Sequence, residues 1–347
     1  MKFLVTGASG FIGASLCHHL LEAGHAVRAA ASALAPADDA LQGLQGLGPD
    51  ARHAKAPEWI QVERSCRNLA AWRAACQGVD AVFHLAGRAH RAAPSVGARA
   101  VYRRDHLEVT QALAEAAIHA GVRRFLFISS TTVYGAHSLV GQAFREDSPT
   151  ASRDDDPYAL SKRETEIFLR TPAISAALAP TIIRLPLVYG AGVKGNMRAL
   201  LRLVDRGIPL PLASVENRRS FVNLPNLVDF LRVAALDEKA RGQTLLVSDN
   251  EDVSTPTLIR AIALGLGKKA RLFAVPPGVL RVVSGILGQG ARCGKLIANF
   301  QIDATHSRDL LNWRPQIGFA EGVARMCAAF HDSKQSCRSG PSHTQIS

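Results

Sequence analysis

Lys2-Phe3-Leu4-Val5-Thr6-Gly7-Ala8-Ser9-Gly10-Phe11-Ile12-Gly13 is the stretch of sequence that decides the fold. Its apolar start predicts a short buried strand, and the residues from 9 to 23 predict a helix with one apolar stripe. Gly24 follows where a helix end favours a left-handed residue. Glycines between a strand and a helix let backbone N–H groups approach a pyrophosphate. The stretch therefore predicts a dinucleotide-binding unit, with a ligand-free glycine turn as the alternative.

Further strand-like and helix-like segments alternate along the chain, which predicts an α/β fold: a Rossmann-type, doubly wound parallel sheet covered on both faces. A smaller α/β C-terminal lobe is expected over the carboxyl edge of the sheet. The expected divisions are a dinucleotide-binding domain over 1–180, a late strand over 181–190 that returns to the sheet, a substrate lobe mainly over 191–332 and a disordered tail over 333–347. The expected segments are strands at 26–30, 81–85, 125–129, 181–185, 245–247 and 272–275, helices at 105–120, 196–206, 224–236 and 256–265, and an irregular insertion over 32–58.

Composition and charge narrow the function classes. The chain has 347 residues, of which 47% are apolar, and a formal net charge of +12. No long Lys/Arg block or basic stripe with interleaved aromatics is present, so we expect no nucleic-acid partner. The positive net charge is consistent with either a generally basic surface or a site that attracts a diphosphate. The 6 cysteines form no Cys-x-x-Cys pair, which predicts neither a metal site nor a disulfide framework. No apolar run is long enough for membrane insertion, and a cytoplasmic location is expected.

Tyr158 and Lys162 form the second informative motif, because Pro157 suits the first position of a helix. Residues at i and i+4 lie on one helix face, so both side chains can point into one cleft. A free tyrosine has a pKa of about 10, and a neighbouring ammonium or an oxidised nicotinamide favours the phenolate. The pair predicts a proton donor and the cation that tunes it; an ordinary packed tyrosine beside a solvated lysine is the alternative.

The Gly7-x-x-Gly10-x-x-Gly13 spacing, together with Tyr158 and Lys162, resembles the extended short-chain dehydrogenase/reductase family of NAD-dependent epimerase/dehydratase type, from Met1 to about Phe330. The resemblance implies cofactor-binding roles for Gly7, Gly10, Phe11, Ile12, Gly13, Arg28, Glu63, Leu85, Ala86, Gly87, Tyr158 and Lys162. Members that use NAD usually carry an acidic residue at the end of the second strand, where this chain has Ala31 and Ser32. The cofactor is expected to be NAD or NADP, with a slight preference for NADP.

Ser129-Ser130-Thr131-Thr132-Val133-Tyr134-Gly135 resembles the family segment that supplies the third catalytic group. The resemblance makes Ser130 the catalytic hydroxyl, with Thr131 as its rival and as a substrate contact. Nucleotide-sugar dehydratases have Asp and Glu where this chain has Thr131 and Thr132, and a hydroxyl does not readily replace a carboxylate as general base. This argues against a dehydratase. His106 stands where the family commonly has Asn, and Leu187 also where Asn is frequent.

Several later segments resemble family members that act on nucleoside-diphosphate sugars, and they imply substrate contacts at Lys194, Asn196 and Arg219. The finer resemblance is to bacterial UDP-sugar 4-epimerases and 4-ketoreductases of surface-polysaccharide biosynthesis, including lipopolysaccharide. It implies an NAD(P)-dependent oxidoreductase acting at C4 of a UDP-hexose or UDP-N-acetylhexosamine, and a possible homodimer. The alternatives are a non-catalytic NAD(P)-binding protein of the same fold and a membrane-surface protein that uses the apolar segment 276–287.

Overall fold

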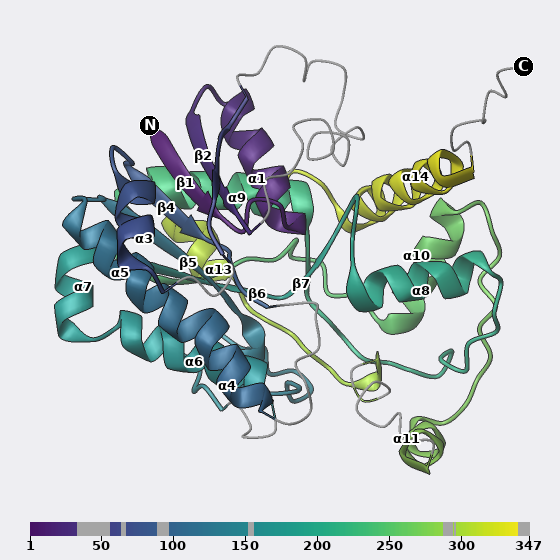
Figure 1. Cartoon of the computed structure of the whole chain (residues 1–347). Helices are drawn as coiled ribbons and strands as arrows, with labels where there is room; N and C mark the ends of the chain where they lie inside the picture. The colour runs from purple at the N-terminus through teal and green to yellow at the C-terminus, as the bar shows by residue number, and fades with distance from the viewer. Residues whose placement is uncertain are drawn as a thin grey trace, which may run out of the picture.

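A seven-stranded parallel sheet forms the centre of the described chain (Figure 1). In this computed structural model the described residues are 1–32, 56–63, 67–88, 97–151, 156–286, 294 and 296–338. The strand order is β3-β2-β1-β4-β5-β6-β9, and every neighbouring pair is parallel. The strands are β1 (Lys2–Thr6), β2 (Ala26–Ala31), β3 (Glu58–Gln61), β4 (Ala81–His84), β5 (Arg124–Ser130), β6 (Thr181–Leu185) and β9 (Thr244–Leu246).

The strand order reverses between β1 and β4, because the chain first proceeds outward to β3 and then returns to the other side of β1. Ligands of open α/β sheets bind at such a point, outside the carboxyl ends of the strands. Thr6 pairs with His84, and His84 pairs with Phe127, so the carboxyl ends of three neighbouring strands meet there. The predicted fold class is confirmed.

Helices cover both faces of the sheet, and each face has its own apolar core. On one face α1 packs against α9, and on the other α3 packs against α5. These helices are α1 (Phe11–Glu22), α3 (Leu69–Cys76), α5 (Val109–His119), α6 (Pro157–Leu169), α7 (Pro172–Leu178), α9 (Leu224–Leu236) and α13 (Thr305–Leu310). The predicted helix over 105–120 is interrupted: α4 (Ala98–Arg103) continues into a π-helical turn, η2 (Arg104–Glu108), before α5 begins. Its end at Gly121 is confirmed, with φ +67°.

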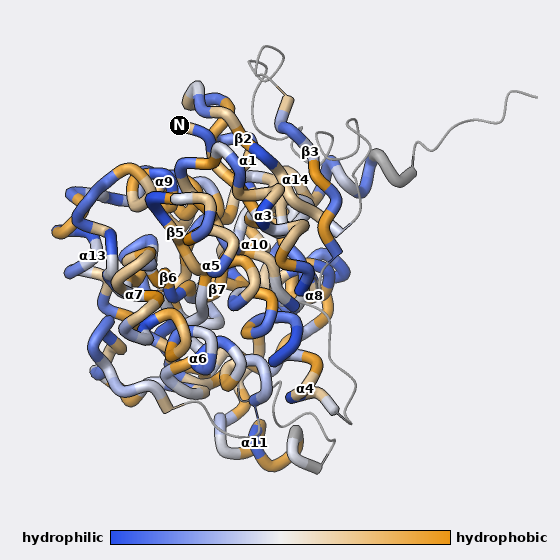
Figure 2. Tube along the Cα trace, turned by 60° about the vertical axis from the view of Figure 1, so that its left-hand side comes forward, coloured by the Kyte–Doolittle hydropathy of each residue, from blue (hydrophilic) through white to orange (hydrophobic). Residues whose placement is uncertain are grey.

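The smaller lobe contains a third apolar core between α8 (Gly195–Asp205), α10 (Thr255–Gly265) and α14 (Phe319–Arg338). These three helices lie together on the right of Figure 1. Its other elements are β7 (Leu187–Tyr189), β8 (Phe221–Asn223) and α11 (Pro277–Ile286). The 3-10 turn η4 (Glu238–Ala240) follows α9 and packs with the sheet domain. In both views α11 lies apart from the sheet, and Figure 2 shows orange segments within it. Among the described helices, none is long and apolar enough to cross a membrane.

Four expectations about the chain's course need correction. Only Thr181–Leu185 of the late strand joins the main sheet; Pro186 has no N–H for the ladder, and β7 pairs with β8 instead. Leu272–Val275 does not form a strand, because Leu272 makes only an isolated bridge to Leu210. The segment 191–332 is not confined to the second lobe, since β9 and α9 complete the sheet domain. Finally, α14 continues to Arg338, so residues 333–338 are helical.

Candidate functional site

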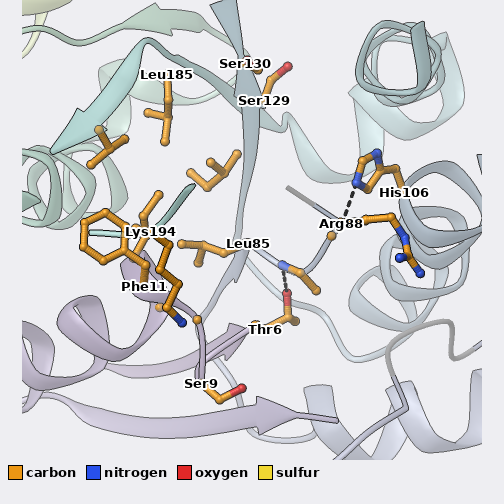
Figure 3. A pocket seen from close by; sticks show the side chains of 18 of the residues that line it. Thr6, Ser9, Phe11, Leu85, Arg88, His106, Ser129, Ser130, Leu185 and Lys194 are labelled. Carbon is orange, nitrogen blue, oxygen red and sulfur yellow. Dashed lines mark hydrogen bonds between the residues drawn. The ribbon is translucent and has the colours of Figure 1, made fainter. Parts of the chain in front are cut away.

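A cavity of about 450 Å³ lies at the carboxyl edge of the sheet, between the two lobes of the described chain (Figure 3). This volume is typical of a small-molecule or cofactor site. Its lining contains most of the residues that the sequence predicted for the site. They come from α1, β5, α6, the start of α8 and the segments that follow β1, β3 and β4. These residues are Gly7, Gly10, Phe11, Ile12, Gly13, Glu63, Leu85, Ala86, Gly87, Ser130, Tyr158, Lys162, Lys194 and Asn196.

The glycine turn at the base of this cavity fits a dinucleotide. Gly7 has φ +70°, a backbone region that side chains with Cβ rarely adopt, and an added Cβ would lie 3.0 Å from the Ala86 nitrogen. A Cβ at Gly13 would lie 2.2 Å from the Gly7 carbonyl oxygen. The turn is therefore closed to side chains, and α1 begins directly after Gly10. Backbone N–H groups and the positive end of α1 can face a pyrophosphate there.

The end of β2 forms the far side of the cofactor cavity. Ala30, Ala31 and Ser32 line it together with Glu63, which follows β3. Arg28, predicted to bind the cofactor, does not line the cavity. Its guanidinium donates to Glu58 Oε1 at 2.9 Å and to the Ala75 carbonyl at 2.7 Å. This placement is a correction, because side chains alternate along a strand and Arg28 ties β2 to β3 and to the end of α3.

Tyr158 stands at the start of α6, where the Asp156 side chain accepts hydrogen bonds from the Tyr158 and Ala159 N–H groups, each 3.1 Å long. That cap and Pro157 fix where the helix begins. Burial raises the pKa of Tyr158 to about 12, while a hydrogen bond with Ser130 acts in the opposite direction. Among the protein's own groups the burial of the phenol therefore dominates, and the predicted lowering of the Tyr158 pKa depends on a bound oxidised nicotinamide.

Lys162 lies one helical turn after Tyr158 and is buried. Its ammonium donates to the Ile128 carbonyl at 2.8 Å and lies 4.6 Å from the centre of the Phe127 ring. Burial lowers the pKa of Lys162 to about 8, and Glu166 opposes that shift. The ammonium is thus held against β5 by a backbone carbonyl and an aromatic face.

A buried ion pair behind the site fixes α6 against the sheet. Arg184 of β6 lies 2.7 Å from Glu166 of α6, and both side chains are at most 3% exposed. Ser129 donates to the same carboxylate at 2.6 Å. A buried carboxylate needs such partners, since an unpaired charge there is costly. Glu166 was not predicted from the sequence. Its position one helical turn after Lys162, on the same face of the helix, was the feature that could have indicated it.

The two hydroxyls that competed for the catalytic role are separated by the structure. Ser130 lines the cavity, and its Oγ accepts hydrogen bonds from the Thr132 N–H and from Thr132 Oγ1. Thr131 is buried outside the cavity lining, where its Oγ1 donates to the Leu185 carbonyl at 3.1 Å. The predicted substrate contact of Thr131 is therefore corrected: the turn η3 (Thr131–Tyr134) directs this side chain toward β6.

The open side of the cavity carries the predicted substrate residues Lys194 and Asn196, both exposed at the start of α8. In Figure 3 Lys194 lies beside Phe11, while His106 and Arg88 lie across the pocket. Arg219 is not among the residues lining the cavity. Its backbone pairs with Val253 and forms a bridge to Phe300, which ties three segments of the lobe together.

Some predicted site residues lie outside the described residues, and one residue that lines the cavity was not predicted from the sequence. The family resemblance also implies a second phosphate-binding arginine near the C-terminus, for which Arg292 and Lys295 are the only candidates, and both lie outside the described residues. Cys66, Cys293 and most of the insertion also lie outside them. Within the described residues no cluster of His, Cys, Asp or Glu suits a metal ion. Arg88 was not selected, although it lines the cavity and pairs with the buried Asp105 at 2.9 Å. Its position directly after Leu85-Ala86-Gly87 was the available signal.

Comparisons with known proteins agree with this architecture. The model of the NAD dependent epimerase/dehydratase family matches residues 3–247. A UDP-glucose 4-epimerase of Vibrio cholerae is 34% identical over 336 residues, covering 95% of each chain. The fold resembles a UDP-glucose-4-epimerase from Stenotrophomonas maltophila with bound NAD, with a TM-score of 0.76, 21% identity and coverage of 96% and 99%. It also resembles the UDP-glucuronic acid 4-epimerase of Bacillus cereus in complex with NAD, with a TM-score of 0.74, 22% identity and coverage of 96% and 97%.

The family match extends over the glycine turn, Ser130, Tyr158 and Lys162, and the long alignment with the Vibrio cholerae protein covers both lobes. The extended short-chain dehydrogenase/reductase resemblance seen in the sequence is thereby confirmed, and the chain belongs to the NAD dependent epimerase/dehydratase family.

Proposed function

We propose that this protein is an NAD-dependent nucleotide-sugar 4-epimerase acting on a UDP-hexose or UDP-N-acetylhexosamine. The observation that carries the proposal is the convergence of Ser130, Tyr158 and Lys162 on one cavity with the glycine turn. The 34% identity to a UDP-glucose 4-epimerase over nearly the whole chain supports the choice of reaction. Thr131 and Thr132 provide hydroxyls where elimination of water requires carboxylates, so a dehydratase is not proposed.

When bound, the dinucleotide supplies the group that accepts and returns hydride. The chain itself handles the proton. Tyr158 takes the proton of the C4 hydroxyl as that carbon is oxidised and returns it when the carbon is reduced, so no net proton is consumed. Ser130 holds the same sugar oxygen by a hydrogen bond. Because burial holds Tyr158 in its phenol form, Ser130 and the bound cofactor's charge must favour the phenolate during the oxidation.

For the cofactor we propose NAD rather than the slight preference for NADP inferred from the sequence. That preference depended partly on Arg28, whose guanidinium is engaged by Glu58 and three backbone carbonyls near the end of α3. No other described cation lines the end of β2, whereas Glu63 does. A carboxylate near this position disfavours a 2′-phosphate. Fluorescence titration with NADH and NADPH tests the choice, and tighter binding of NADPH contradicts it.

At the open side we propose that Lys194 and Asn196 contact the nucleotide or diphosphate of the substrate. Both are exposed at the N-terminal end of α8, whose helix dipole also favours an anion. Arg219 remains a proposed diphosphate ligand, although it lies outside the cavity lining and requires the substrate to extend beyond it. The net charge of +12 favours approach of such a dianionic ligand.

The experiment is a product assay on the purified enzyme with catalytic NAD, using mass spectrometry and NMR of the sugar. Epimerisation converts UDP-glucose or UDP-N-acetylglucosamine to the galacto isomer at equilibrium, without net change in NADH. Stoichiometric consumption of NADPH with a UDP-4-keto sugar instead identifies a 4-keto reductase. Tight cofactor binding without turnover of either substrate supports the non-catalytic alternative and overturns the proposal.

A further inference from the structure

His106 occupies the π-helical turn η2 and is 1% exposed, yet both of its ring nitrogens and its carbonyl oxygen are hydrogen-bonded. Its ring reaches two different parts of the site at once, the segment after β4 and the helix that carries Tyr158. π-Helical turns of this kind often lie at functional sites.

The hydrogen bonds of the ring determine which nitrogen carries the proton. The Arg88 backbone N–H donates to His106 Nε2 at 2.9 Å, so Nε2 must be the unprotonated acceptor. The proton therefore lies on Nδ1, which donates to Ser161 Oγ at 2.7 Å. Ser161 Oγ in turn donates to the Tyr158 carbonyl at 2.8 Å. A continuous chain thus joins the backbone after Gly87 to the first turn of α6.

A second chain reaches the carbonyl of the same residue. Thr110 Oγ1 donates to the His106 carbonyl at 2.6 Å, so this hydroxyl accepts a hydrogen bond from the Nε2–H of His84, 2.9 Å away. His84 Nδ1 then accepts from Thr6 Oγ1 at 2.8 Å. Thr6 Oγ1 accepts from the Ala86 N–H at 3.1 Å. The ring and the carbonyl of His106 are therefore both tied to the segment Leu85–Arg88, through separate partners.

Packing gives the ring little freedom to move. A Cβ at Gly87 would lie 2.8 Å from His106 Cδ2 and Nε2, and 3.8 Å from Lys162 Nζ. On its other side the His106 ring meets the Tyr158 ring at 78°, with their centres 5.6 Å apart. Figure 3 shows the His106 ring directed at the Arg88 backbone. Burial lowers the pKa of His106 well below its ordinary value, and the nearby cations Lys162 and Arg88 act in the same direction. The carboxylate of Asp105 is engaged by Arg88 and Arg104.

We propose that His106 is a positioning residue which, as its neutral Nδ1–H tautomer, connects the Gly87–Arg88 segment beside the cofactor to the turn of α6 that carries Tyr158. This rests on the proposed function, because it assigns His106 a role in aligning the proton donor with the cofactor. The ring needs an acceptor on one side and a donor on the other. An asparagine provides both with its amide, whereas phenylalanine provides neither and retains the ring volume.

The test uses His106→Phe, His106→Asn and Ser161→Ala, with His119→Phe as the matched control at an exposed position of α5. His106→Phe is expected to lower kcat about 100-fold with KM changed less than about three-fold, because small misplacement of a catalytic group costs this much. His106→Asn is expected to restore kcat to within about ten-fold of wild type, Ser161→Ala to lie between, and the control to match wild type. Equal kcat for wild type and His106→Phe, or a loss in His106→Asn as large as in His106→Phe, overturns the proposal.

A second readout needs no turnover. Nitrogen-15 NMR of the histidines at pH 7 is expected to show one neutral Nδ1–H ring whose signals disappear in His106→Asn; a neutral Nε2–H or a charged ring there overturns the proposal. The chain has four tyrosines, so the Tyr158 ring signal can be assigned with Tyr158→Phe. That signal is expected to shift in both His106→Phe and His106→Asn, because each variant changes the side chain that lies against the Tyr158 ring, and not in His119→Phe. If wild type binds NADH and gives these spectra but turns over no UDP-sugar, the proposed function fails while the placement of His106 stands; an unmoved Tyr158 signal in His106→Phe refutes the placement.

Discussion

The two sides of the cavity are built on opposite principles. On the cofactor side, His84, His106 and Lys162 are buried and hydrogen-bonded to defined partners. On the substrate side, Lys194 and Asn196 are exposed at the start of α8. Buried polar groups must satisfy one another within the fold, while exposed ones are solvated until a ligand arrives. The polar groups of the cofactor side are therefore held by contacts within the fold, whereas the substrate side presents its polar side chains to solvent.

This contrast separates alignment of the reacting groups from recognition of the substrate. Changes on the cofactor side should reduce kcat or stability, and changes on the substrate side should raise KM while the chemistry continues.

Tyr158→Phe should produce the largest effect. Removing the phenol oxygen removes the proton donor, and such groups contribute about 10²–10⁴-fold, so kcat is expected to fall about 10³-fold. NADH binding should change less than about three-fold. The matched control is Tyr102→Phe, whose ring lies 6.0 Å from that of Tyr158 and should retain activity within about three-fold. Unchanged turnover in Tyr158→Phe refutes the mechanism.

Gly13→Ala should come next, because its Cβ would lie 2.2 Å from the Gly7 carbonyl oxygen within the glycine turn. Forcing the backbone apart is expected to cost about 3 kcal/mol of unfolding free energy and to abolish measurable NADH binding. Gly278→Ala in α11 is the control, since a Cβ there meets nothing within 4 Å. Urea unfolding and NADH fluorescence provide the measurements; wild-type values for Gly13→Ala would show that the turn is not closed.

His84 should make the stability of the cofactor side depend on pH. Burial lowers the pKa of His84 to about 3 from an ordinary value of 6.5. Below pH 6.5 His84 becomes protonated in the unfolded chain but stays neutral in the folded chain. Its contribution to the free energy of unfolding is therefore fully present above pH 6.5 and is lost as the pH falls toward 3. Between pH 7 and pH 5 this loss is about 2 kcal/mol.

The measurement is urea unfolding of wild type and His84→Gln at both pH values. The glutamine variant is expected to be less stable at pH 7 but to lose about 2 kcal/mol less on acidification. An identical pH dependence of the unfolding free energy in the two proteins would show that His84 is not the titrating group. It would also show that water reaches the His84 ring in the folded protein.

Lys194→Ala should have the smallest effect and the opposite kinetic pattern. Loss of one exposed, charge-assisted contact is expected to raise KM about ten-fold with kcat within about two-fold. Lys239→Ala, on the remote turn η4, is the control and should leave both constants unchanged. A fall in kcat with KM unchanged would show that Lys194 aligns the reacting groups, as residues of the cofactor side do, and does not only bind substrate.

Much of the cofactor side was predictable from sequence because each part depends on local chain geometry. Gly7, Gly10 and Gly13 lie in one turn, and Tyr158 and Lys162 in one helix. Motifs of this kind carry their own spacing, so their roles can be inferred before the fold is known. The predicted helix over 224–236 was likewise confirmed with the same bounds, since one segment contains its whole apolar face.

Other parts depended on contacts between distant segments. The predicted cavity contacts of Arg28 and Thr131 differ from the structure because each side chain has a hydrogen-bond partner elsewhere. Arg28 is bound by Glu58 and the end of α3, and Thr131 is bound by the Leu185 carbonyl. The position of Glu166 on its helix could be inferred locally, but its partner Arg184 lies on a distant strand. The interruption of the helix at His106 gave no local signal.

The sequence by itself determined the Rossmann-type sheet, the glycine turn after its first strand and the pairing of Tyr158, the proposed proton donor, with Lys162 on one helix. Each of these follows from hydrophobic period, glycine spacing or helical spacing within one segment. Only the tertiary structure decided that His106 faces both Arg88 and Ser161, that Ser130 and not Thr131 lines the cavity, and that Arg28 lies outside it. The physical reason is that a buried polar group takes its partner from whichever element the fold brings within hydrogen-bond distance. That choice is made across the sheet and not along the chain.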